Sequence, residues 1–139
     1  MKIREALIAD IDAMHRVRMS VKENVLVTQS LVTAELYELH LVHYGKGWVC
    51  EVDGAVVGFT IIDKQKSNLW ALFVHPDFEG KGIGRKLHDT MIEWAFSNGL
   101  RSIYLSTDPG TRAERFYLKA GWSRGKMQEN GEVEFVMRK

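Results

Sequence analysis

A chain of 139 residues, 45% hydrophobic and 27% charged, can bury one core without disulfides, so we expect a single domain over residues 1–139. With 19 basic and 18 acidic residues its net charge is +1, which argues against a nucleic-acid-binding protein. The one cysteine, Cys50, excludes an internal disulfide and predicts a buried thiol in a reducing compartment. The charged N-terminus and the short apolar runs lead us to expect no signal peptide, no membrane span and a cytoplasmic location.

The first 45 residues predict one strand and two helices. The strand is expected at Met1–Glu5, and Asp10 is expected to cap the first helix. Residues 18–32 have no clean period and predict a loop. Thr33 then caps the second helix, which Gly45 ends. The apolar stripes of the two helices comprise Ile11, Met14 and Val17 in the first, and Leu36, Leu39, His40 and His43 in the second.

Three strands are predicted next. Trp48–Val52 and Ala55–Asp63 should form a hairpin across Asp53-Gly54, which is a strong signal for a two-residue turn. The third strand, Asn68–Val74, runs into the segment VHPDFEGKGIGRKL at residues 74–87. This segment carries glycines at alternate positions 80, 82 and 84, just before a helical pattern.

The rest of the chain predicts two helices and three strands. The first of these helices ends at Asn98-Gly99 and is followed by a strand at Arg101–Thr107. Thr111 and Glu114 have the spacing of a capping box and open the second helix. The helix over residues 83–97 presents an apolar stripe of Ile83, Leu87, Met91 and Trp94. The last predicted segments are strands near Trp122–Gln128 and Glu132–Arg138, joined at Asn130-Gly131.

The element order β-α-α-β-β-β-α-β-α-β-β predicts an α/β fold with a mixed sheet. The strands on either side of the helix at 83–97 are joined by a crossover, which makes them parallel neighbours. Most other connections are hairpins and give antiparallel pairs. We therefore expect a twisted, mostly antiparallel sheet with one parallel strand pair and helices on both faces.

The glycine segment predicts an anion site. A parallel strand that runs into a glycine-rich turn and a helix N-terminus exposes backbone N–H groups to a ligand, and phosphate or pyrophosphate is the natural guest. The string contains no P-loop, and its G-x-G-x-G spacing in mid-chain differs from the Rossmann fingerprint. A tight turn without a ligand is the remaining alternative, although one glycine usually suffices for it. The residues at the rim that add positive charge are Lys81, Arg85 and Lys86.

Two motifs resemble the signatures of the GNAT superfamily of N-acetyltransferases. Residues 74–84 resemble the acetyl-CoA signature Q/R-x-x-G-x-G/A preceded by V-x-P, and AERFYLKAGW at 113–122 resembles the second signature A-x-x-F-Y-x-K-x-G-F. The element order is also similar to that of the family along the whole chain. The matching residues are Val74, His75, Pro76, Gly82 and Gly84 in the first motif, and Ala113, Phe116, Tyr117, Lys119 and Gly121 in the second.

Two positions depart from the family pattern. Glu79 stands where the family has Gln or Arg facing phosphate, and because its carboxylate cannot donate a hydrogen bond we expect it to face solvent or pair with a nearby Lys or Arg. Gly110 replaces the Asn that usually precedes A-x-x-F-Y, so a contact to the pantetheine arm is expected to be missing. We expect the backbone cradle to survive both changes.

The resemblance implies transfer of an acetyl group from acetyl-CoA, as co-substrate and without a metal, to a primary amine of a small molecule or peptide by direct attack. It implies that a backbone N–H near Phe73–Val74 stabilises the oxyanion. It also implies that Tyr117 protonates the departing thiolate, with Phe116 filling the core while Tyr117 faces the cleft. A core aromatic is the alternative for Tyr117. The residues expected to contact the cofactor are Phe73, Val74, Glu79, Gly80, Lys81, Gly82, Ile83, Gly84 and Arg85.

The sequence does not single out one general base, and it indicates the acceptor wall only by position. Glu23, Asp108, and a water chain ended by Ser106 or His75 all stay open as the base. Zinc is improbable for His40 and His43, even with His15 nearby, because no further ligand stands at metal-binding spacing. The resemblance implies instead that the N-terminal helices and residues 19–26 form the acceptor wall. The side chains expected along this wall are His15, Arg16, Arg18, Tyr37, His40, His43 and Tyr44.

Other functions remain as alternatives. A CoA-binding sensor or interaction domain of the same fold would retain the site without turnover, and Glu79 and Gly110 keep that reading open. A nucleotide-dependent phosphotransferase is remote, since the P-loop lysine spacing and the Mg²⁺ carboxylates are missing from the sequence. Neither nucleic acid nor membrane is expected as a partner. If the chain forms a homodimer, the C-terminal strands are the expected seam, with Val133–Met137 as an exposed edge.

Overall fold

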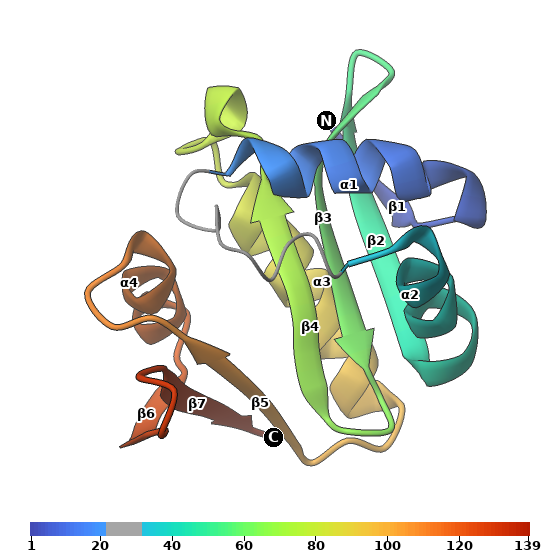
Figure 1. Ribbon diagram of the computed structural model, residues 1–139. Coiled ribbons are helices and arrows are strands. Elements are labelled where there is room, and N and C mark those ends of the chain that lie inside the picture. Colours follow the sequence, from blue (N-terminus) through green and yellow to red (C-terminus); the bar gives the residue numbers. More distant parts are fainter. Residues whose placement is uncertain (22–31) are drawn as a thin grey trace.

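The computed structural model describes residues 1–21 and 32–139 (Figure 1). The strands are β1 (Lys2–Glu5), β2 (Gly45–Val52), β3 (Ala55–Asp63), β4 (Asn68–Val74), β5 (Ser102–Thr107), β6 (Ser123–Met127) and β7 (Val133–Arg138). The α-helices of the described residues are α1 (Ile11–Ser20), α2 (Ala34–Leu39), α3 (Ile83–Ser97) and α4 (Arg112–Lys119). The described residues also contain short 3-10 turns at Ile8–Asp10 and Pro76–Phe78 and a π-helical turn at His40–Tyr44.

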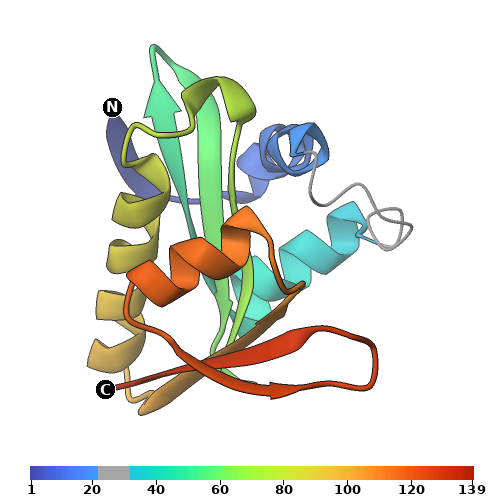
Figure 2. The same ribbon diagram turned by 90° about the vertical axis from the view of Figure 1, so that its left-hand side faces the viewer.

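The strands form one seven-stranded sheet in the order β1-β2-β3-β4-β5-β7-β6. Every pair is antiparallel except β4–β5, which confirms the predicted mixed sheet with one parallel pair. Figure 2 shows α1 and α2 on one face of the sheet and α3 on the other. The core is accordingly divided: α1 and α2 pack on one face, around Met14 and Phe59, while α3 and α4 pack on the other, around Leu87 and Phe135.

The strands β4 and β5 separate soon after they meet. They are paired in register only at Asn68 and Tyr104, and Figure 1 shows them diverging toward their C-terminal ends. Ile61 lies opposite Ala71 and Ile62 opposite Leu69, so Trp70 is the extra residue of a β-bulge in β4. A bulge bends and twists its strand. The edge of β4 that faces β5 is therefore left open over the last residues of the strand.

The predicted hairpin turn and two predicted helix caps are confirmed. Asp53 and Gly54 both have positive φ, 51° and 81°, as a two-residue hairpin turn requires. The hydroxyl oxygens of Thr33 and Thr111 accept from the N–H groups of Leu36 and Glu114, which confirms both predicted caps.

Two local predictions were wrong, those on the Asp10 side chain and on the stripe of the second helix. Asp10 does not cap α1 with its side chain: it accepts from Leu7 N–H and pairs with Arg4. Gly45 ends the helical segment as predicted, and it also begins β2. It must be glycine, since a Cβ there would lie 1.6 Å from Ile62 O. The buried stripe of the second helix contains Tyr37 and His40, whereas Leu39 and His43 are exposed. The reason is that the helix continues as a π-helical turn at His40–Tyr44, which changes its period.

The predicted exposed edge at Val133–Met137 was also wrong. β7 lies between β5 and β6, and β6 forms the edge of the sheet, with every one of its residues exposed. The hairpin returns the last strand beside β5, which is why β6 takes the outer position. Arg124 and Lys126 on that edge discourage pairing with a second sheet.

None of the helices in the described ranges combines the length and the apolar character needed to cross a bilayer.

His88 ties α3 to the second half of the chain. It is buried, and its Nε2 accepts from Trp122 Nε1–H at 2.8 Å, so the proton of the neutral ring lies on Nδ1, which donates to Asp89 Oδ1 at 2.8 Å. Burial lowers the pKa of His88 below its ordinary value, although the Asp89 carboxylate acts in the opposite direction.

We expect this burial to make the protein less stable in mild acid. Because the folded pKa is lowered, the unfolded state binds more protons as the pH falls through about 6.5, so the free energy of unfolding decreases there. Urea unfolding at about pH 5 and about pH 7 measures this difference. In His88→Gln, whose amide oxygen accepts from Trp122 without titrating, the decrease should be smaller. An equal decrease in both proteins contradicts the assignment to His88.

Candidate active site

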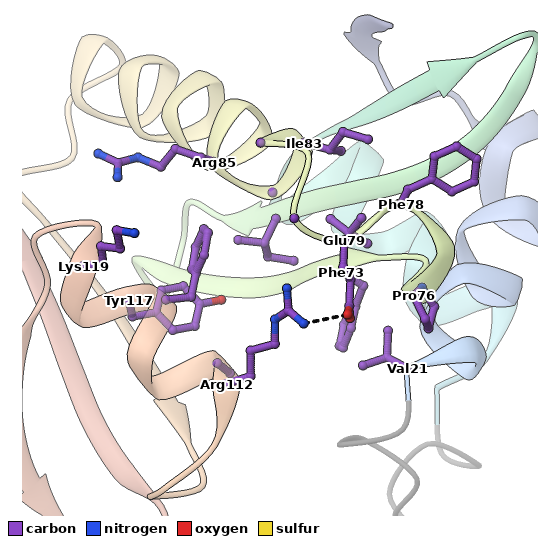
Figure 3. Close-up of a pocket in the computed structure, with 17 residues that line it drawn as sticks. Val21, Phe73, Pro76, Phe78, Glu79, Ile83, Arg85, Arg112, Tyr117 and Lys119 are labelled. Carbon is purple, nitrogen blue, oxygen red and sulfur yellow. Dashed lines mark hydrogen bonds and ion pairs between the residues drawn. The ribbon is translucent and has the colours of Figure 1, made fainter.

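A cavity of about 790 Å³ lies where β4 and β5 separate (Figure 3). Its walls come from the end of β4, the loop that follows it, the first turn of α3, and α4. The residues that line it are Val21, Leu72, Phe73, Val74, Pro76, Phe78, Glu79, Gly80, Gly82, Ile83, Gly84, Arg85, Arg112, Ala113, Phe116, Tyr117 and Lys119. Every residue predicted to contact the cofactor is in this set except Lys81, whose ammonium extends 5.3 Å from the centre of the Phe78 ring.

The first turn of α3 opens into this cavity without a side-chain cap. Its N-cap residue is Gly82, in the left-handed conformation at φ 81°, and the first backbone bond of the helix runs from Lys86 N–H to Gly82 O. The N–H groups of Ile83, Gly84 and Arg85 therefore have no acceptor within the helix. Together with the positive end of the helix dipole, these groups form an anion site.

The glycines of this loop serve two purposes. Gly80 and Gly82 have φ of 76° and 81°, which side chains rarely tolerate, so the backbone conformation requires them. Gly84 is helical, and a Cβ there would meet only Phe116 and Val74, each at 3.6 Å. Its missing side chain leaves room at the cavity wall rather than relieving backbone strain.

Glu79 forms an ion pair across the cavity. Its carboxylate accepts from Arg112 Nη1 at 2.7 Å, and the pair joins the loop after β4 to the start of α4, as the dashed line in Figure 3 shows. This confirms the prediction that Glu79 pairs with a nearby cation. Arg112 was not predicted as a site residue, and no local pattern could have found it, because the two residues are 33 positions apart.

The open edge of β4 offers backbone donors to the cavity. His75 N–H donates to Val57 O on β3 at 2.8 Å, and alternate residues of a strand point their N–H groups to opposite edges. Phe73 N–H therefore faces β3 as well, whereas the N–H groups of Leu72 and Val74 face the side where β5 has separated. Of the two residues predicted for an oxyanion donor, Val74 has the suitable direction.

Tyr117 lies in the cavity wall on α4. The side chain is buried, and Figure 3 shows its hydroxyl oxygen pointing into the space between α4 and β4. Burial raises the pKa of the Tyr117 phenol well above its ordinary value, so the group stays protonated at neutral pH. The predicted division of roles was wrong in one respect: Tyr117 belongs to the core, Phe116 is only partly buried, and both line the cavity.

None of the residues left open as a general base is found in the described part of the cavity wall. Asp108 and Ser106 are exposed outside it, and His75 uses its Nδ1 to accept from Asp77 N–H at 3.1 Å. Glu23 lies outside the described residues, as do residues 22–26 of the predicted acceptor segment. Val21 from that segment does line the cavity.

The residues predicted for the acceptor wall form two groups on the α1–α2 face. His15 Nδ1 lies 3.1 Å from Tyr37 Oη, and Arg18 lies over the rings of Trp70 and Phe73. In the second group, His40 stacks on Trp70 with ring centres 4.0 Å apart and is in edge contact with Tyr44. Arg16 and His43 are exposed.

His40 has a buried carboxylate neighbour that the sequence did not indicate. Its Nε2 lies 3.6 Å from Asp63 Oδ2, at the end of β3. Within residues 1–21 and 32–139, no group of three or more His, Cys, Asp or Glu side chains is arranged to hold a metal ion. The pair joins the π-helical turn to the end of β3.

Gly110 has a local reason to be glycine. Its φ is 76°, a conformation that glycine adopts freely and that asparagine adopts more readily than most other residues. Its N–H donates to Glu114 Oε1 at 3.2 Å, so the carboxylate of the predicted capping box reaches one residue beyond the N-cap Thr111. Gly110 thus keeps the backbone shape that an Asn could also provide, without the side-chain amide.

Comparison with known proteins identifies the family. The sequence matches the model of the acetyltransferase (GNAT) family over residues 12–122, which include the cavity loop, α3 and α4. The chain belongs to the GNAT family.

Two archaeal relatives support this assignment. An uncharacterized N-acetyltransferase of Methanocaldococcus jannaschii is 34% identical over 85 residues, which are 54% of this chain and 38% of that protein. An uncharacterized N-acetyltransferase of Archaeoglobus fulgidus is 35% identical over 93 residues, 60% of this chain and 63% of that protein. The matches thus span less than two thirds of either relative.

Solved structures share the fold over the whole chain. The PaiA N-acetyltransferase of Thermoplasma acidophilum, solved in complex with coenzyme A, superposes with a TM-score of 0.86 over 99% of this chain and 98% of that one. At 15% sequence identity this likeness establishes the GNAT fold alone.

Proposed function

We propose that this GNAT protein transfers an acetyl group from acetyl-CoA to a primary amine of a small molecule or peptide. The observation that carries the proposal is the uncapped first turn of α3, which opens into the same cavity as the free β4 edge and Tyr117. Three unpaired backbone N–H groups suit the pyrophosphate of acetyl-CoA, and the cavity continues past them to the separated strands. The coenzyme A complex of the Thermoplasma acidophilum protein adds support from the same fold.

The cavity residues suit two needs of the reaction, a donor for the oxyanion and an acid for the departing thiolate. Val74 N–H is placed to donate to the carbonyl oxygen as it gains negative charge. Attack by the neutral amine forms the C–N bond, breaks the C–S bond and leaves a thiolate. Tyr117, kept protonated by burial, donates its proton to that sulfur and recovers one from solvent. The nitrogen, which carries a positive charge after the attack, releases its surplus proton to solvent and leaves the neutral amide.

Direct attack is favoured over an acetylated enzyme. Cys50, the one cysteine of the chain, is fully buried in β2, and burial raises the pKa of its thiol. A buried thiol of raised pKa is a poor nucleophile. The amine is therefore proposed to attack the thioester itself, in a single transfer.

Binding and turnover test the proposal separately. Acetyl-CoA should raise the melting temperature of the protein, whereas ATP should not. Release of free thiol should then follow when amines, polyamines, amino acids, aminoglycosides or peptides are added with acetyl-CoA. Stabilisation by acetyl-CoA without thiol release from any amine would favour the alternative of a CoA-binding sensor, and no stabilisation would reject both.

Glu79 is expected to weaken the binding of acetyl-CoA slightly. Its carboxylate repels phosphate, but Arg112 neutralises it, and with side chains 33% and 56% exposed this pair is screened by water. We expect Glu79→Gln to lower the Kd of acetyl-CoA about two- to fivefold, and Arg112→Ala to raise it by a similar factor. Calorimetric titration measures both, with the exposed Glu129→Gln as control. An unchanged Kd in both variants contradicts this account.

A cytoplasmic location and assembly as a homodimer stay predictions of the sequence. Size-exclusion chromatography with light scattering tests the second.

A further inference from the structure

Arg18, near the end of α1, is hydrogen-bonded to the Tyr37 side chain, but two of its buried donors have no acceptor. Its guanidinium carbon lies 4.8 Å from the centre of the Phe73 ring and 5.6 Å from that of Trp70. Its Nε and Nη1 are shielded from solvent and have no hydrogen-bond partner among the described residues. The ion pairs found in that part of the chain do not include Arg18 either.

Such an arrangement requires an explanation. Buried donors in folded proteins nearly always have partners, and the exceptions commonly mark functional sites or an absent ion or water. The aromatic rings compensate part of the charge, since a guanidinium is attracted to the face of a ring. They do not accept the N–H bonds in the plane of the guanidinium. Nε and Nη1 are thus left for an acceptor that is not among the described residues.

Arg18 does not itself line the cavity, but its guanidinium lies over the ring of Phe73, which does. Phe73 and Val21, both near Arg18, line the cavity. The side chain of Phe73 packs with the α1–α2 core, whereas its neighbours Leu72 and Val74 pack with the α3–α4 core. An amine that approaches the β4 edge from the α1 face would therefore pass Arg18.

We propose that Arg18 binds a carboxylate of the acceptor, so that the substrate is an amine that also carries a carboxylate. The planar guanidinium offers its N–H groups in a fork that matches a carboxylate, and partial burial strengthens such a pair. His15 and Tyr37 lie on the same side of β4 and add polar groups beside Arg18. The inference rests on the proposed function, since it names the substrate class of that reaction.

Pairs of ligands that differ only in the carboxylate measure its contribution to binding. Protein saturated with CoA is titrated by calorimetry with the standard amino acids and with their C-terminal amides, which keep the amine and lose the negative charge. A second arm compares the peptide amides Ala-Asp-NH₂ and Ala-Asn-NH₂, which distinguishes a peptide source of the carboxylate from a free amino acid. We expect at least one acid to bind about tenfold more tightly than its uncharged counterpart.

Variants test whether Arg18 causes the difference in affinity between each acid and its uncharged counterpart. Arg18→Met keeps an apolar stem against Phe73 and should abolish the preference for the acid, while Arg18→Lys should retain part of it. Arg101→Met, which removes an exposed positive charge before β5, should retain all of it. The titration of each variant with CoA shows that it is folded.

Two results would overturn the inference: equal binding of every acid and its uncharged counterpart in the wild type, or a preference that survives in Arg18→Met. Thiol release is measured independently. Turnover of amines without any preference for the acids would reject the role of Arg18 and leave the proposed function intact. Absence of thiol release with every amine would count against the proposed function, whatever the titrations show.

Discussion

Tyr117→Phe is expected to lower kcat about 10²- to 10⁴-fold, the usual range for the loss of a general acid. The substitution removes only the hydroxyl, so the ring contacts with Phe116 and Trp122, at centre distances of 5.2 and 5.5 Å, are retained. The Kd of acetyl-CoA should therefore change little. Steady-state thiol release and calorimetric titration measure the two quantities on the same preparation.

The matched control is Tyr104→Phe. Tyr104 is exposed on β5, so the same chemical change there should leave kcat and Kd unaffected. A loss of affinity in Tyr117→Phe equal to the loss in kcat would indicate a structural role for the phenol. Unchanged kcat would remove Tyr117 from the mechanism and leave the thiolate to be protonated by solvent.

The cavity loop could be predicted from the sequence because its geometry has local causes. Positive φ at Gly80 and Gly82 follows from the chain itself, and the uncapped turn of α3 follows from having glycine at the N-cap. The parallel arrangement of β4 and β5 follows from the helix between them. The glycine conformations and the uncapped turn depend on residues close together in the chain, and the parallel pair depends on the type of connection between its strands, so the sequence pattern was sufficient to predict them.

The features that were missed depend on contacts between distant segments. Glu79 meets Arg112 only because α4 packs opposite the loop, and His40 meets Asp63 only because the π-helical turn lies over the end of β3. The two unpartnered donors of Arg18 likewise depend on packing against the rings of Trp70 and Phe73. Such partners follow from tertiary packing, so a single sequence offers no periodicity or motif that would predict them.

Gly84→Val is expected to weaken acetyl-CoA binding at least about 100-fold while the protein remains folded. The first methyl is tolerated, because a Cβ would lie 3.6 Å from both Phe116 and Val74, which is ordinary contact. Two further methyl groups have no room against these side chains, so they would extend into the cavity beside the free N–H groups of the α3 first turn. A ligand that must approach those groups closely would be displaced.

The control variant Gly84→Ala separates the steric displacement of acetyl-CoA from any change in the geometry of α3. Alanine has the higher helix propensity, and its one methyl fits the space that the structure leaves, so acetyl-CoA should still bind to the alanine variant with an affinity near that of the wild type. Calorimetric titration of both variants, with melting temperatures as a measure of folding, tests the pair. If valine were accepted as well as alanine, the pyrophosphate could not lie against the first turn of α3, and the anion site would have to be sought elsewhere in the cavity.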